Sequence, residues 1–66
     1  MITVLLADDQ AMIRQAFSAL LGLEPDFEVV GQAGDVAETV RKVAEFQPEV
    51  VLLDVQMPSP TDPHAD

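Results

Sequence analysis

The chain has 66 residues and no cysteine, and its twelve acidic residues outnumber three basic ones, which gives a formal net charge of −9 at pH 7. A chain of this length holds one small domain at most, and neither a disulfide nor a thiolate metal site can stabilise it. Arg14, Arg41 and Lys42 do not make the cationic face that binding to a nucleic-acid backbone needs, so we expect no direct binding of DNA or RNA.

The first apolar run, residues 2–7, is continuous rather than alternating and predicts a strand buried on both faces. Asp8, Asp9 and Gln10 end this strand. Apolar residues then recur with the spacing of one helical stripe, namely Ile13, Ala16, Phe17, Leu20 and Leu21. Asp9 is suited to cap the start of this helix, and Gly22 is suited to end it.

A turn at Pro25 and Asp26 precedes a second predicted strand over residues 27–33. Asp35 and Glu38 then have the spacing of a capping box, which marks the start of a second helix. The apolar stripe of that helix is Val36, Val40, Val43 and Ala44. We expect Arg41 and Lys42 to lie on its solvated side.

Pro48 ends the second helix at or before Gln47. Residues 50–53 predict a third strand that is again apolar on both faces, with Asp54 at its end. Residues 59–66 are proline-rich and have no periodicity, so we expect a disordered tail after a folded unit of residues 1–58.

The order strand, helix, strand, helix, strand predicts an α/β fold in which parallel strands are joined by crossover helices. If the first strand lies between the other two, right-handed crossovers place the two helices on opposite faces of the sheet. The longest apolar runs are far too short to span a bilayer, and the first residues lack the pattern of a signal peptide. We therefore expect a cytoplasmic protein with no membrane partner.

Two of the predicted strands end in aspartate, and ligand sites of open parallel sheets lie beyond the carboxyl ends of the strands. With the first strand in the centre, Asp8, Asp9 and Asp54 become neighbours at one edge. Gathered carboxylates repel one another unless a cation neutralises them, and an all-oxygen cluster favours Mg²⁺ or Mn²⁺. A metal beside a free carboxylate suits phosphoryl transfer to that carboxylate.

The sequence resembles a bacterial response-regulator receiver domain over about residues 1–58. The likeness lies in the run Val4-Leu5-Leu6-Ala7-Asp8-Asp9-Gln10, in the helix from Met12 to Leu21, and in Val51-Leu52-Leu53-Asp54-Val55-Gln56-Met57-Pro58. Residues 27–33 are similar to the LuxR-type transcriptional subgroup. An isolated Asp-Asp pair is weak, but the pair together with Asp-x-x-Met-Pro about 45 residues later, across a βαβα pattern, is specific.

The resemblance implies a flavodoxin-like receiver fold with strand order 2-1-3 and helices on both faces. It implies that Asp8 and Asp9 bind Mg²⁺ and that Asp54 accepts a phosphoryl group from a sensor histidine kinase. Gln56 then contributes its backbone carbonyl to the metal. Such a protein is a phosphoacceptor of a two-component system that regulates transcription, rather than a turnover enzyme.

The sequence also departs from the family. A full receiver is close to twice as long, and its second half carries a Ser or Thr and a Lys that contact the phosphoryl group. Lys42 is the only lysine here and lies in the second helix, while Thr61 lies in the tail. We therefore expect a truncated receiver, without the DNA-binding domain of LuxR-type proteins, that switches weakly or not at all.

Two other functions fit the sequence less well. The third strand leaves an open apolar edge, which favours pairing with a second copy or another chain in a non-catalytic interaction fragment. A nucleotide-binding βαβ unit is disfavoured, because no glycine follows the first strand to let phosphates approach the backbone.

Overall fold

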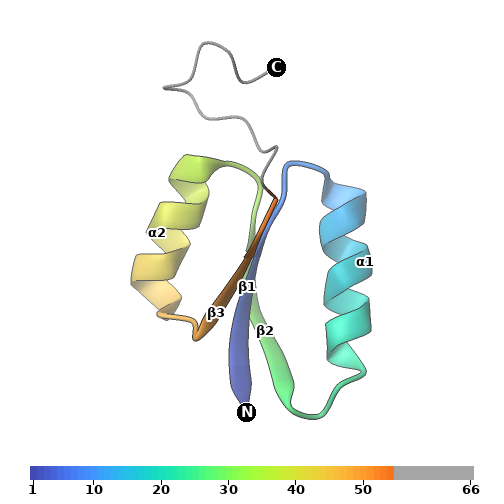
Figure 1. Ribbon diagram of the computed structural model, residues 1–66. Helices are drawn as coiled ribbons and strands as arrows, with labels where there is room; N and C mark the ends of the chain where they lie inside the picture. Colours follow the sequence, from blue (N-terminus) through green and yellow to red (C-terminus); the bar gives the residue numbers. More distant parts are fainter. Residues whose placement is uncertain (55–66) are drawn as a thin grey trace.

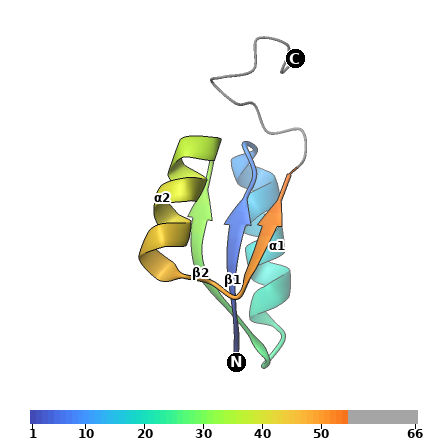
Figure 2. The ribbon, with the colours of Figure 1, turned by 60° about the vertical axis from the view of Figure 1, so that its left-hand side comes forward.

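The computed structural model describes residues 1–54 of the chain, and within them strands and helices alternate (Figure 1). The elements are β1 (Ile2–Ala7), α1 (Ala11–Gly22), β2 (Phe27–Ala33), α2 (Val36–Phe46) and β3 (Val50–Leu53). The strands are parallel in the order β2-β1-β3 (Figure 2), and the two helices cover opposite faces of the sheet. The predicted α/β fold is confirmed. The expectations for Gln56 and for the tail at 59–66 lie outside the described residues.

The central strand β1 forms the core of the molecule. Residues 4–7 are at most 3% exposed, and Ala33 of β2 is buried with them. Both edges of β1 are hydrogen-bonded, to β2 on one side and to β3 on the other. A strand that is paired on both edges and covered on both faces needs apolar side chains throughout, which is why this run does not alternate.

The face of α1 that meets the sheet overlaps the predicted apolar stripe only in part, at Leu21. Its most sheltered residues are Arg14, Ser18 and Leu21, which have helical spacing, whereas Phe17 is 49% exposed and Leu20 is 61% exposed. The described sheet has only three strands, and α1 packs over β2 and β1. Part of the apolar stripe of α1 therefore lies beyond the surface that these two strands cover.

The ends of α1 also differ from the prediction. The helix begins at Ala11, so Gln10 rather than Asp9 occupies the capping position, and the side chain of Gln10 makes no capping hydrogen bond. Gly22 is the last helical residue, and Leu23 follows it in the right-handed region. The helix therefore ends without the left-handed glycine that we expected.

The predicted start of α2 is confirmed. The Asp35 side chain accepts a hydrogen bond of 2.7 Å from the Glu38 amide, and the Glu38 carboxylate accepts one of 2.7 Å from the Gly34 amide. The expectation for Lys42 was wrong, because its ammonium group donates to the Gln32 carbonyl and lies 3.7 Å from Glu38. A lysine can do both because its long apolar stem packs on the protein while the charged end reaches polar atoms.

Strand β3 is apolar but not buried. Its four residues are 37–56% exposed, because among the described elements only β1 packs closely against it. A strand that is apolar on both faces suits a sheet covered on both sides, but within residues 1–54 this strand is not covered in that way. The expected open edge is present among these residues. Neither α1 nor α2 is long and apolar enough to cross a membrane.

Candidate metal centre

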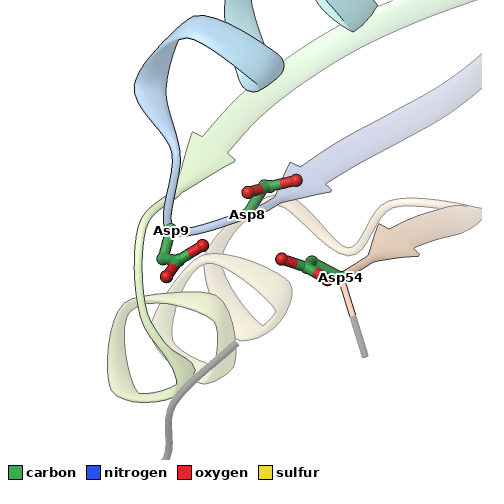
Figure 3. A group of neighbouring side chains, drawn as sticks. All are labelled: Asp8, Asp9 and Asp54. Atoms are coloured by element: carbon green, nitrogen blue, oxygen red, sulfur yellow. The ribbon is translucent and has the colours of Figure 1, made fainter. Parts of the chain in front are cut away.

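Three aspartates meet at the carboxyl end of the sheet. Asp8 and Asp9 follow β1, and Asp54 follows the neighbouring strand β3 (Figure 3). Each offers one carboxylate oxygen to a cluster in which these oxygens all lie within 4.8 Å of one another. Asp8 and Asp54 are half-buried, whereas Asp9 is exposed. The structure thus brings together the three acidic residues that the sequence singled out.

The backbone of the sheet continues into this cluster. The Asp54 amide donates a hydrogen bond of 2.9 Å to the Ala7 carbonyl, and the Asp8 amide donates one of 3.0 Å to the Ala33 carbonyl. Both aspartates are therefore held by the same ladder of bonds that holds β1, β2 and β3 together. The main chain of Asp8 and that of Asp54 are therefore both hydrogen-bonded into the sheet.

The Asp8 side chain is held from its own loop. The Gln10 amide donates a hydrogen bond of 2.9 Å to Asp8 Oδ1, which is the local bond that Asp side chains make in turns. Because Oδ1 is the acceptor, the second oxygen of this carboxylate remains for a ligand. The turn leads directly into α1.

The electrostatics of the cluster favour a cation. Two unit negative charges at about 4 Å repel by about 1 kcal/mol even in bulk water, and by more where water is partly excluded. Carboxylate oxygens without histidine or cysteine match the donors that Mg²⁺ and Mn²⁺ prefer. The three residues therefore fit a divalent cation, which Asp8, Asp9 and Asp54 would hold. Gln56, the fourth expected ligand, lies outside the described residues.

Sequence reasoning missed Arg14, which contacts the cluster at Asp8, and Gln32, which contacts Arg14. The Arg14 guanidinium donates to the backbone carbonyl of Asp8 and, at 3.4 Å, to Gln32 Oε1 on β2. A signal for this contact exists in the sequence, because helical side chains lean toward the N-terminus of their helix. An arginine in the first turns of a helix is therefore able to reach back to the acidic loop before it.

The chain matches known proteins with this arrangement. The sequence profile of the response regulator receiver domain matches residues 4–62. The transcriptional regulatory protein LiaR of Bacillus subtilis is 47% identical over 57 residues, which are 86% of this chain and 27% of LiaR. The DNA-binding transcriptional activator DevR/DosR of Mycobacterium tuberculosis is 43% identical over 58 residues, 88% of this chain and 27% of that protein. These relatives are LuxR-type response regulators, as the sequence predicted.

Solved structures agree in fold and in sequence. The response regulator domain of Thermotoga maritima CheB superposes with a TM-score of 0.84 at 40% identity, over 88% of this chain and 43% of that chain. A chain from the complex of the CheA3 P1 domain with CheY6 of R. sphaeroides superposes with a TM-score of 0.79 at 41% identity, over 86% of this chain and 45% of that chain.

The chain thus spans about a quarter of the length of these curated relatives and under half of the solved chains. The profile nevertheless matches most of the present sequence, and the three aspartates lie together at the end of a sheet with the expected topology. The chain belongs to the response regulator receiver domain family.

Proposed function

We propose that Asp54 accepts a phosphoryl group from a sensor histidine kinase while a divalent cation, Mg²⁺ or Mn²⁺, is bound by Asp8, Asp9, Asp54 and the backbone carbonyl of Gln56. The observation that carries this proposal is the cluster of the three carboxylates within 4.8 Å. The proposal assigns the reaction to the cytoplasm and makes the protein a phosphoacceptor in transcriptional regulation, rather than a turnover enzyme.

The proposed step is a transfer between two nucleophiles. A carboxylate oxygen of Asp54 forms a bond to phosphorus while the bond from phosphorus to the kinase imidazole nitrogen breaks, and that nitrogen keeps the electron pair. A bound cation supplies charge neutralisation for the transferred group. Asp8 and Asp9 bind that cation, and the bond from the Asp54 amide to Ala7 orients the backbone of the acceptor.

We further propose that these 66 residues by themselves switch weakly. Lys42 is the single lysine of the sequence, and its ammonium group is engaged by the Gln32 carbonyl and by Glu38 on α2. It is therefore committed to holding α2 on the sheet. A lysine that couples phosphorylation to a change of conformation has to contact the phosphoryl group directly, whereas the ammonium group of Lys42 is bound to Gln32 and Glu38.

Beryllium fluoride with Mg²⁺ tests the acceptor site, because it mimics a phosphoryl group on a carboxylate. We expect fluorine NMR to show bound signals that require both Mg²⁺ and Asp54, and that disappear in Asp54→Asn. Asp26→Asn, which removes one carboxylate in the turn before β2, is the matched control and should leave them. If a longer receiver binds the probe and this chain does not, the proposal is wrong.

A second candidate function is pairing with another copy through β3, for which the exposure of all four of its residues is the specific observation. An apolar edge strand with unpaired backbone groups is a template for another strand. Leu52 and Leu53 of this strand, together with Phe17 of α1, help to line a hollow of about 180 Å³ whose wall also includes Asp8 and Arg14. Sedimentation at several protein concentrations distinguishes a chain that pairs through β3 from a chain that stays single. A monomer at all concentrations excludes pairing.

A further inference from the structure

An arginine lies where the packing of α1 calls for an apolar side chain. Arg14 is half-buried on the face of α1 that meets the sheet, between Ser18 and the acidic loop. Sheltering a guanidinium from water is costly unless its N–H groups find acceptors. The position therefore indicates that Arg14 has polar partners whose arrangement matters.

Arg14 has one partner in the loop after β1 and one partner on β2. Its Nη1 atom donates to the Asp8 carbonyl oxygen at 2.5 Å, and its Nε atom is 3.4 Å from Gln32 Oε1. Gln32 lies on β2, beside Leu6 of β1 in the register of the sheet. Arg14 thus joins the loop after β1 to β2, from its own position on α1.

The bond to Asp8 involves a particular carbonyl. The Asp8 carbonyl belongs to the peptide unit that connects Asp8 to Asp9, so the backbone dihedral angles on either side of that unit affect where the two side chains point. The Asp8 amide is held by Ala33, and the Asp8 side chain by the Gln10 amide. Arg14 adds a bond to the carbonyl of the peptide unit that lies between the two acidic residues.

The structure leaves space for the guanidinium at this point. A Cβ atom on Gly34 would come within 3.3 Å of Arg14 Nη1. Because Gly34 has no side chain, the loop after β2 can approach Arg14 closely at this position. A planar group with donors in a fixed fork suits such a slot better than a flexible ammonium does.

We propose that Arg14 is a positioning residue that orients Asp8 and Asp9 for the divalent cation by connecting the Asp8 carbonyl to Gln32. The inference rests on the proposed metal site. It makes a counterintuitive prediction: the loss of a positive charge near a cation site, taken alone, tightens cation binding, whereas the loss of a positioning contact weakens it.

The test compares Arg14→Met with Arg41→Met, which makes the same charge change at an exposed site on α2. Two quantities are measured in the folded protein: the Kd for Mn²⁺, from the electron paramagnetic resonance of the free ion, and the backbone order parameters of Asp9 and Gln10 in metal-free buffer. We expect Arg14→Met to raise the Kd about tenfold and to lower both order parameters from the rigid value of about 0.85. Arg41→Met should change neither.

Equal or tighter Mn²⁺ binding by Arg14→Met overturns the proposal, and so does weaker binding without a loss of order. If Arg14→Met does not fold, the same measurements on Arg14→Lys and Gln32→Leu test the proposal. Each of these variants removes part of the connection that Arg14 makes between the Asp8 carbonyl and Gln32. Both are expected to raise the Kd by a smaller factor, and wild-type values in both overturn the proposal. If the wild-type chain binds no Mn²⁺, the proposed metal site fails, and the metal-free order parameters alone decide whether Arg14 orders the loop.

Discussion

The Asp54 amide donates a 2.9 Å hydrogen bond to the carbonyl oxygen of Ala7, the residue immediately before Asp8. Ala7 also lies beside Leu53 in the register of β1 and β3. Asp8 follows Ala7 and Asp54 follows Leu53, and Ala7 and Leu53 are partners in the sheet. The pairing of the two strands therefore sets how far apart the backbones of Asp8 and Asp54 lie. The proposed metal site depends on this register, because a slip by one residue would turn the side chains to opposite faces.

Asp9→Asn tests the repulsion within the cluster. Removing one of three close negative charges should raise the free energy of unfolding in metal-free buffer by about 1 kcal/mol, as measured by urea denaturation. It should also reduce the extra stability that Mg²⁺ confers by binding the folded state. Asp26→Asn makes the same charge change in the turn before β2 and should have smaller effects on both. Equal effects in the two variants would point to the overall charge of −9 instead of the cluster.

Gly31 and Gly22 make a matched pair for packing. A Cβ atom on Gly31 would lie 3.1 Å from Leu5 Cδ1 and 3.1 Å from Phe46 Cε2, whereas a Cβ atom on Gly22 meets nothing within 4 Å. Gly31→Ala should therefore lower the free energy of unfolding by about 1–3 kcal/mol. Gly22→Ala lies in α1 and should raise it by at most about 1 kcal/mol. Urea denaturation of both variants checks the pair, and equal losses would contradict the close approach at Gly31.

Glu38 makes the start of α2 sensitive to acid. The hydrogen bond from the Gly34 amide, with a smaller contribution from the charge of Lys42, lowers the pKa of Glu38 below its ordinary value of 4.5. A carboxylate with a lowered pKa in the folded state adds stability above its unfolded pKa, and that stability is lost as the pH falls through the folded pKa. The stability difference between wild type and Glu38→Gln should therefore be complete above pH 4.5 and decline below it.

Lys42→Met separates the two causes of this pKa shift. Because the Gly34 hydrogen bond is the larger cause, the pKa of Glu38 should remain below 4.5 in the variant. The carboxyl carbon of Glu38, followed by NMR across the acid range, reports this pKa directly. A return to 4.5 in Lys42→Met would show that the charge of the lysine is responsible instead.

Val51→Lys tests pairing through β3. Val51 is 37% exposed on the edge strand, and Val40, on α2, is 63% exposed and makes a control for the same change. A lysine on an edge strand disfavours strand addition, so a dimer seen for the wild-type chain should dissociate in Val51→Lys and persist in Val40→Lys. Each copy carries a charge of −9, so added salt should strengthen the dimer by screening. Sedimentation velocity at two salt concentrations measures both effects.

The strands and the acidic cluster could be predicted because their signals are local. A continuous apolar run such as residues 2–7 suits a strand covered on both faces, and Asp8 and Asp54 each follow such a run directly. Parallel strands then bring Asp8 and Asp54 to the same edge.

The orientation of α1 could not be predicted in the same way. Counting apolar residues favours a face with Phe17 and Leu20, but the sheltered face carries Arg14, whose hydrogen bonds to Asp8 and Gln32 compensate for its burial. The exposure of β3 also depends on which other elements cover the sheet. The residues of β3 alone do not indicate this. Both features are set by contacts between elements.

Intact mass spectrometry after incubation with acetyl phosphate tests the central claim most directly. With Mg²⁺ present, a phosphoryl group should appear on the chain, with acetate as the leaving group, and fragmentation should locate it on Asp54. The group should be absent when the metal is chelated and in Asp54→Asn. If a longer receiver in the same tube is modified while this chain carries no adduct at Asp54, the account of Asp54 as a metal-dependent phosphoacceptor is contradicted.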